Sequence, residues 1–179
     1  MDFKKLETDI VFSITNTINH IKKQSYWDNI NSFCLYTDES FISISLLFNT
    51  NTYFEEKKDD TYPLTNKYSP AEWFSETISK DDDEYLYNNV AFSSVSSMMM
   101  KFSLSDEHEE DNDKNNIAKV CINAMKFCIK NNLFQKPEST IYLFMLSDGY
   151  GEEELLNWNK DLNIQAIQKE LLKWINEEL

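Results

Sequence analysis

Apolar residues recur at steps of three and four positions along residues 3–21, 85–102 and 117–133. This spacing places them on one face of an α-helix, as in helices that pack against a core. We therefore predict amphipathic helices over these three ranges and a further helix near residues 164–175. The clearest stripe consists of Phe3, Leu6, Ile10, Ile14, Ile18 and Ile21.

Strand-like patterns follow the first of these segments. Residues 33–36 and 41–48 are apolar or alternating and are separated by the turn-forming residues 37–40, which predicts two antiparallel strands. Residues 140–146 form a continuous apolar run, which is typical of a strand covered on both faces. We predict that this last segment is the central strand of the sheet.

The order of these elements predicts an α+β fold. Helices and strands do not alternate as they would in a series of βαβ units, so we expect a small, largely antiparallel sheet of three or more strands packed against four or five helices. A length of 179 residues suits one globular domain covering residues 1–179. The polar segments near 55–67 and 105–116 lack periodicity, and we predict solvated loops there.

The segment from Tyr68 to Trp73 has the local pattern of a helix start. Ser69 is a favourable N-cap, Pro70 occupies the first helical position, and Glu72 is placed to reach back to the Ser69 amide. Tyr68 and Trp73 flank this capping box in the positions of a hydrophobic staple. We therefore interpret Glu72 as a capping carboxylate rather than a catalytic one.

The charged residues are strongly unbalanced. All 17 basic residues are lysines and 31 residues are acidic, which gives a net charge of −14. The missing arginine reflects either function or a genome of biased nucleotide composition, and it removes the guanidinium fork that binds phosphates in pairs of hydrogen bonds. An acidic surface repels nucleic acid, so we expect no nucleic-acid partner. The sequence has no long apolar run and begins without a signal pattern, so we expect a cytoplasmic protein with no membrane partner.

The residues that support common catalytic and metal sites are few. The three cysteines lack a C-x-x-C pair and are expected to be buried apolar thiols. The acidic runs 81–84 and 106–113 lack the central glycine and closing glutamate of a calcium loop, and His108-Glu109 lacks the second histidine of a zinc protease. We therefore predict no cofactor, no metal and no assigned catalytic residue.

An acidic protein is attracted to basic partners, and this attraction increases their rate of association at low salt. The densest acidic run and the turn that follows the apolar run 140–146 are the segments where such contacts are expected. Gly149 and Gly151 allow a tight turn there and hold an aromatic residue between them. The candidate partner-binding residues are Glu107, Glu109, Glu110, Asp111, Asp148 and Tyr150.

Several strings in a fixed order resemble a known family. They are Leu35-Tyr36-Thr37-Asp38, Asn49-Thr50, the segment from Tyr68 to Trp73, residues 120–126, Phe144-Met145-Leu146-Ser147-Asp148 and Leu162-Asn163. Together they resemble domain of unknown function family 4303 over nearly the whole chain. The resemblance implies a mainly bacterial family without an established activity or catalytic residues. Some of its relatives are associated with contact-dependent toxin systems, which implies an immunity-like role.

These observations favour a non-catalytic, immunity-like protein that neutralises a basic partner such as a cognate toxin. Two alternatives stay open. The first is an adaptor or interaction module with another cellular role. The second is an enzyme that uses carboxylates, with Glu72 or Asp148 as candidates, on an unknown small substrate.

Overall fold

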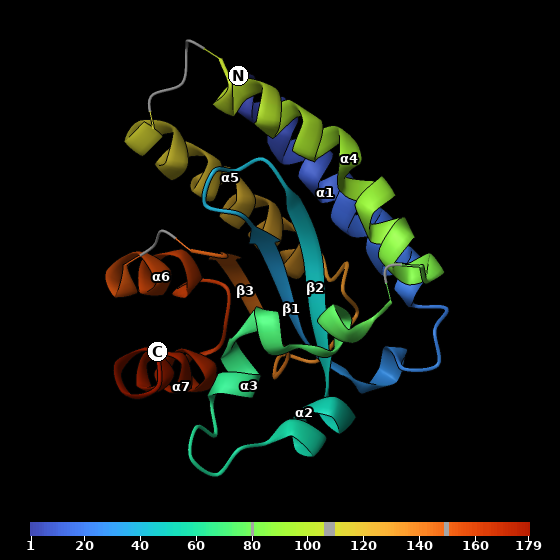
Figure 1. Ribbon diagram of the computed structural model, residues 1–179, viewed down its shortest axis with the longest axis vertical. Coiled ribbons are helices and arrows are strands. Elements are labelled where there is room, and N and C mark those ends of the chain that lie inside the picture. Colours follow the sequence, from blue (N-terminus) through green and yellow to red (C-terminus); the bar gives the residue numbers. More distant parts are fainter. Residues whose placement is uncertain (80, 106–109, 149–150) are drawn as a thin grey trace.

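The computed structural model describes residues 1–79, 81–105, 110–148 and 151–179, with the side chains of 83–86 and 110–112 left out. Its centre is a three-stranded sheet in the order β2-β1-β3 (Figure 1). The strands are β1 (Ile30–Thr37), β2 (Ile44–Thr50) and β3 (Ile141–Leu146). Helices cover both faces of this sheet, which creates two separate hydrophobic cores.

The larger core lies under the three long helices α1 (Phe3–Ile21), α4 (Asp83–Ser103) and α5 (Glu110–Lys130) (Figure 1). The predicted stripe of α1 faces inward, and its members from Leu6 to Ile21 are at most 2% exposed. The periodic pattern therefore predicted these helices correctly, because each one buries a single continuous face.

The smaller core lies on the opposite face of the sheet, under α3 (Thr65–Tyr68), α6 (Glu152–Asn159) and α7 (Gln165–Glu177). The strand β3 serves both cores because successive side chains of a strand point to opposite faces. Its residues Ile141, Leu143 and Met145 join the smaller core, and Tyr142, Phe144 and Leu146 join the larger one. All six are buried, so a strand covered on both faces is confirmed.

The α+β class is confirmed, but the sheet is mixed. The β1–β2 pair is antiparallel, whereas β1 and β3 are parallel. The prediction that residues 140–146 form the central strand is wrong, because β1 is central and β3 lies at an edge. A continuous apolar run shows that both faces of a strand are covered, but it carries no information about its two edges. Helices in the described ranges also outnumber the four or five predicted, with seven α-helices.

Two asparagine side chains cover the outer edge of β3. Asn159 is fully buried at the end of α6; its Oδ1 accepts from the Phe144 amide at 2.8 Å and its Nδ2 donates to the Phe144 carbonyl at 3.0 Å. Asn163 makes the same pair of hydrogen bonds with the backbone of Tyr142, at 2.8 and 2.7 Å. These two amide groups satisfy backbone groups that a neighbouring strand would otherwise bind.

Side chains also cover the outer edge of β2. The amide of Leu46 donates to Asn88 Oδ1 at 3.4 Å, and Asn88 Nδ2 donates to the Leu46 carbonyl at 3.2 Å. The amides of Ile44 and Phe48 donate to the hydroxyl oxygens of Ser96 and Ser75, at 3.2 and 3.0 Å. Both edges of the sheet are therefore closed by side chains of other segments.

The two predicted loops are shorter in the structure. The helix α2 (Asn51–Lys57) and α3 leave only residues 58–64 of the first loop without helix, and α5 already begins at Glu110 in the second. Acidic residues near a helix N-terminus are stabilised by the helix dipole, which accounts for a polar, acidic first turn that periodicity alone does not mark as helical.

The predicted capping box at Ser69 is wrong. Residues Pro70–Glu72 form a single 3₁₀ turn, and the Ser69 side chain makes no capping hydrogen bond. The turn ends at Trp73, whose backbone is extended and whose side chain is fully buried in the smaller core beside Tyr68. Tyr68 and Trp73 thus act as core residues that anchor this segment and do not form a staple for a longer helix.

Candidate functional site

Acidic side chains from several segments gather at one end of the sheet. Because β1 and β3 are parallel, both strands end at the same edge, with Thr37 beside Leu146. The Ser147 amide donates to the Thr37 carbonyl at 2.9 Å, and this hydrogen bond joins the C-terminal ends of β1 and β3. Asp38 and Glu39 therefore follow β1 at the same end of the molecule at which Asp148 follows β3.

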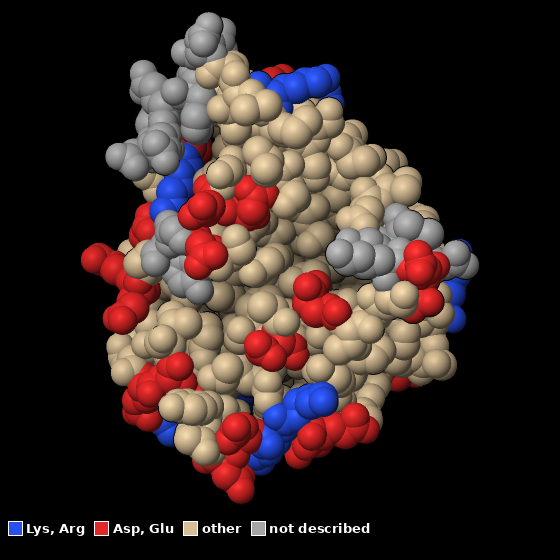
Figure 2. All heavy atoms as spheres, viewed as in Figure 1, with Lys and Arg blue, Asp and Glu red and all other residues tan. Residues whose placement is uncertain are grey.

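Two helix starts add to this end. Lys114 of α5 and Glu154 of α6 are 3.4 Å apart, so the first turns of these helices are neighbours. Glu152 and Glu153 are exposed in the first turn of α6. We call the exposed group Glu39, Asp148, Glu152 and Glu153 the acidic end. Figure 2 shows one face of the whole molecule, on which acidic side chains are scattered widely and lysines lie mostly toward the margins.

Some acids near this end have structural roles. The Asp38 carboxylate accepts hydrogen bonds from the amides of Ser40, Ile42 and Ser43 at 2.6–3.2 Å, and from the Ser43 hydroxyl. It therefore holds the β1–β2 turn, in which Phe41 has a positive φ of 53°. By contrast, within the described ranges no hydrogen bond or ion pair occupies the carboxylates of the acidic end.

The predicted partner-binding residues separate into three groups. Asp148 is exposed directly after β3, as expected. Glu110 and Asp111 begin α5 and therefore lie near α6, although their side chains are not described. Glu107, Glu109 and Tyr150 lie outside the described residues. The topology thus places Asp148 and the start of α5 at the same end, which their separation in sequence did not reveal.

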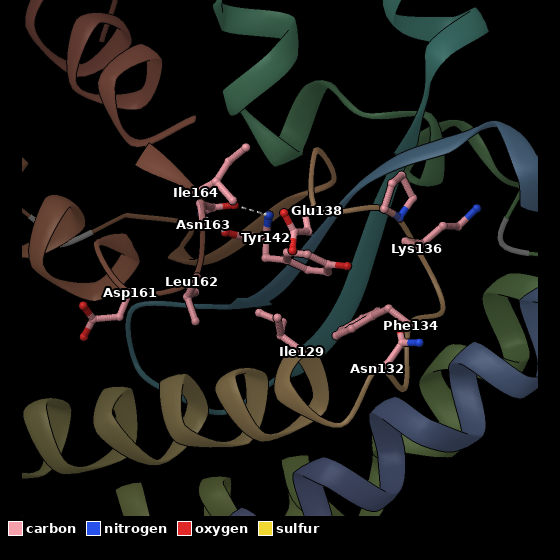
Figure 3. A pocket seen from close by; sticks show the side chains of 11 residues that line it. Ile129, Asn132, Phe134, Lys136, Glu138, Tyr142, Asp161, Leu162, Asn163 and Ile164 are labelled. Atoms are coloured by element: carbon pink, nitrogen blue, oxygen red, sulfur yellow. Dashed lines mark hydrogen bonds between the residues drawn. The ribbon is translucent and has the colours of Figure 1, made fainter. Parts of the chain in front are cut away.

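A hollow of about 430 Å³ lies at the opposite end of the sheet (Figure 3). Its walls come from the end of α5, the connection from α5 to β3, and the link between α6 and α7. Ile129, Phe134, Tyr142 and Leu162 form an apolar surface, and the Glu138 side chain stands beside the Tyr142 ring. This hollow is of the size that small-molecule sites have.

Two ionisable groups at this hollow are each held in a single protonation state at neutral pH. Burial raises the pKa of Tyr142 to about 12, against a hydrogen bond from the Thr140 side chain that lowers it, so the phenol is neutral at pH 7. Asp161 forms an ion pair with Lys126 at 2.7 Å, and the hydrogen bond from Lys126 lowers the Asp161 pKa. The Asn163 amide is occupied by the backbone of Tyr142.

A second hollow of about 520 Å³ adjoins the first and shares Lys136 and Pro137 with it. The Lys136 ammonium donates to the Trp27 carbonyl and lies 4.1 Å from the centre of the Trp27 ring. Burial lowers the Lys136 pKa, and the nearby Asp28 carboxylate acts in the opposite direction. Lys136 is therefore held against Trp27, at the boundary between the two hollows.

The connection beside these hollows contains two residues in the left-handed region. Asn132, with φ of 52°, ends α5 in a Schellman motif, where the Leu133 amide donates to the Cys128 carbonyl at 2.9 Å. Gln135 has φ of 51°, which costs a residue with a side chain about 1–2 kcal/mol.

We expect Gln135→Gly to raise the free energy of unfolding by about 0.5–1 kcal/mol, since glycine removes this strain but has greater freedom in the unfolded chain. Urea denaturation of the variant and of Gln168→Gly, placed within helix α7, measures the effect. The control variant Gln168→Gly is expected to lower the free energy of unfolding by about 1 kcal/mol. A loss of stability in Gln135→Gly as well would contradict the strain argument.

Other chemistry-bearing groups are buried or dispersed. Cys34, Cys121 and Cys128 are free and buried, as predicted, and burial raises the pKa of each thiol, to about 12 for Cys128. Glu72 is exposed in its 3₁₀ turn. No group of three or more histidine, cysteine, aspartate or glutamate residues suited to a metal ion occurs among the described residues. In the same part of the chain, every helix is too short or too polar to cross a bilayer.

The residues that cover both edges of the sheet were not recognised from the sequence. No structural role was assigned to Asn88, Asn159 or Asn163, although their side chains replace missing strand neighbours. Asn49 is 1% exposed, accepts from the Phe74 amide and donates to the Asn66 carbonyl, so it ties the segment after α2 to the sheet. The only available signal was the presence of Asn49 and Asn163 in the strings that carried the family resemblance.

Comparison with known proteins agrees with that resemblance. No curated protein and no solved structure matches the chain. A family model described as Domain of unknown function (DUF4303) matches residues 11–164 of the 179 residues. The match includes most of α1, the whole sheet and α6, and it therefore covers both ends of the sheet described above. Because it spans well over half of the chain, the protein belongs to the DUF4303 family.

Proposed function

We propose that this protein is a non-catalytic binding domain whose acidic end engages a basic protein, in the manner of an immunity protein that neutralises a toxin. The observation that carries the proposal is the convergence of four exposed carboxylates, from three separate segments, at one end of the sheet. Glu39, Asp148, Glu152 and Glu153 come from the β1–β2 turn, the exit of β3 and the start of α6.

The carboxylates of the acidic end are available to a partner. The neighbouring acids Asp38 and Glu154 are occupied by backbone amides, and Glu154 is also paired with Lys114. The strands and the helix start that carry the acidic end are fixed by the Ser147–Thr37 hydrogen bond and the Lys114–Glu154 ion pair. A rigid set of like charges raises the association rate with an oppositely charged surface by about 10-fold to 1,000-fold at low salt.

The test is a comparison of two variants with equal net charge. The first neutralises the acidic end by Glu39→Gln, Asp148→Asn, Glu152→Gln and Glu153→Gln. The control neutralises four exposed acids elsewhere, by Glu55→Gln, Glu56→Gln, Asp60→Asn and Asp81→Asn. The probe is a basic protein captured from native lysate by the parent chain at low salt, and stopped-flow measurements at low and high salt give its association rate.

We expect the first variant to associate at least tenfold more slowly than the parent protein at low salt, with the difference shrinking as salt screens the charges. The control is expected to slow by less than about threefold, because only its net charge changes. Expression of the captured protein alone should stop growth; in co-expression, the parent chain and the control should restore growth, and the first variant should restore less. Equal slowing in both variants would contradict an interface at the acidic end. Continued killing with the parent chain, with no complex on gel filtration, would reject the proposed function.

A further inference from the structure

A second surface lies in the groove between α6 and α7, and on α6 it begins one helical turn after Glu152 and Glu153 of the acidic end. These two helices lie side by side (Figure 1), and their outer faces enclose a space of about 350 Å³. One wall contains Leu156 and Lys160, and the other contains Gln165, Gln168, Lys169 and Leu172. Leucine side chains therefore form the apolar part of the groove, and lysine side chains lie next to these leucines.

The outward face of α7 has the spacing of a helix-binding surface. Gln165, Gln168, Lys169 and Leu172 follow one another at steps of three, one and three, which places them on one side of the helix. The buried residues of α7, such as Ile167 and Trp174, belong to the smaller core. Leu172 is 43% exposed, so a large apolar side chain on this second face has no cover within the described chain.

The charge of the groove is opposite to that of the protein as a whole. No carboxylate lines it, whereas Glu138 and Asp161 line the hollow at Tyr142, and acidic residues also line the other two hollows. Lys169 takes part in no ion pair in the part of the chain that the structure describes. Lys160 contacts the Asn157 side chain at 3.4 Å, and its charge also acts on the adjacent Asp161, whose carboxylate is paired with Lys126. In a chain with a net charge of −14, this is a local site for negative charge.

We propose that the groove between α6 and α7 binds an amphipathic helix of another protein that carries acidic residues beside its apolar stripe. A third helix fits a trough between two helices because its ridge of side chains enters the groove that they form. In this arrangement the apolar side chains of the partner helix cover Leu156 and Leu172, and its carboxylates face Lys160 and Lys169. This surface adjoins the acidic end on α6 but has different lining residues, and it would take a partner of opposite charge.

The probe for this surface is a synthetic helical peptide of about 15 residues, with leucines at helical spacing and glutamates beside them. A matched peptide has lysines in place of the glutamates. We expect the acidic peptide to bind with a dissociation constant below about 1 mM, and the basic one at least tenfold more weakly. Amide chemical shifts in NMR spectra give both affinities and locate the contact, so the measurement does not depend on the partner of the acidic end.

Three variants make the test specific. Leu172→Glu is expected to weaken the acidic peptide at least tenfold, while Phe127→Glu, at a similarly exposed apolar residue on α5, is expected to change its affinity by less than twofold. The double change Lys160→Glu and Lys169→Glu is expected to reverse the preference between the two peptides. Equal binding of both peptides, equal effects of Leu172→Glu and Phe127→Glu, or no saturation by the acidic peptide would overturn the proposal. Self-association of the parent chain that Leu172→Glu abolishes would also overturn it, because the groove would then hold a second copy.

Discussion

Replacing Asn159 by leucine is expected to lower the free energy of unfolding by about 2–5 kcal/mol. The side chain is fully buried and makes three hydrogen bonds, to the amide and carbonyl of Phe144 and to the carbonyl of Leu155. Leucine has a similar size but makes none of these bonds, so the Phe144 backbone loses both partners in a buried position. Each buried group without a partner costs about 1–3 kcal/mol. Urea denaturation followed by circular dichroism measures the change.

The matched control is Asn157→Leu, two residues earlier on the same helix, where the side chain is exposed. We expect it to change stability by less than about 0.5 kcal/mol. A loss below 1 kcal/mol in Asn159→Leu would show that the edge of β3 does not depend on this amide.

The variant Asn159→Asp provides a second test, because its free energy of unfolding should depend on pH. The new carboxylate would face two carbonyl oxygens in a buried place, so its pKa in the folded state rises above the unfolded value of about 3.9. The charged form is therefore less stable in the folded protein than in the unfolded chain. As pH falls from 7 toward 4, the carboxylate takes up a proton in the folded state before it does so in the unfolded chain. The difference in free energy of unfolding between this variant and the parent protein should therefore shrink. A deficit independent of pH would contradict the assigned hydrogen bonds.

Trp73→Ala is expected to cost about 3–5 kcal/mol, because it leaves a cavity in the smaller core. Trp73 is fully buried there, in the same cluster as Trp174 and Leu171. Its indole N–H has no hydrogen-bond partner within the described ranges, so the contribution comes from packing. Trp73→Phe should therefore retain a large part of the stability that Trp73→Ala loses. Calorimetry of the three proteins compares them directly.

Ser69→Ala and Glu72→Ala separate this core role from a capping role. A functional N-cap loses about 0.5–2 kcal/mol on replacement by alanine. The Ser69 side chain makes no capping bond and Glu72 is exposed, so we expect each change to stay within about 0.5 kcal/mol. A loss above 1 kcal/mol in either variant would restore the capping box inferred from the sequence.

The sequence predicted the helices well because their signal is local. The stripe in α1 predicted both its bounds and its buried face, since one face of a helix repeats within a few residues. The paired strands β1 and β2 were predicted for the same reason, although Ile42 lies before β2 and is 44% exposed. The Ser69 pattern failed because the burial of Trp73, a tertiary effect, ends the turn after three residues.

Strand order and the ends of the sheet depend on contacts that a local pattern does not contain. The parallel pairing of β1 with β3 joins segments that are about one hundred residues apart, and it brings Asp148 to the end at which Glu39 lies. The acidic residues that follow β1 and β3 were visible in the sequence, but their meeting at one end was not. Asn159 gave no signal at all, because an asparagine that binds a strand edge looks the same in a sequence as one that faces water.

The closed edges of the sheet limit how other molecules can attach to this protein. Many peptides dock by extending a host sheet with one more strand, and they depend on free backbone donors and acceptors at its rim. Here the amides of Ile44, Leu46 and Phe48 on one side, and of Tyr142 and Phe144 on the other, already have side-chain acceptors. An added strand would find these amides already bonded, so the interfaces proposed above rely on side chains of helices and turns and would select a partner by its charge and shape.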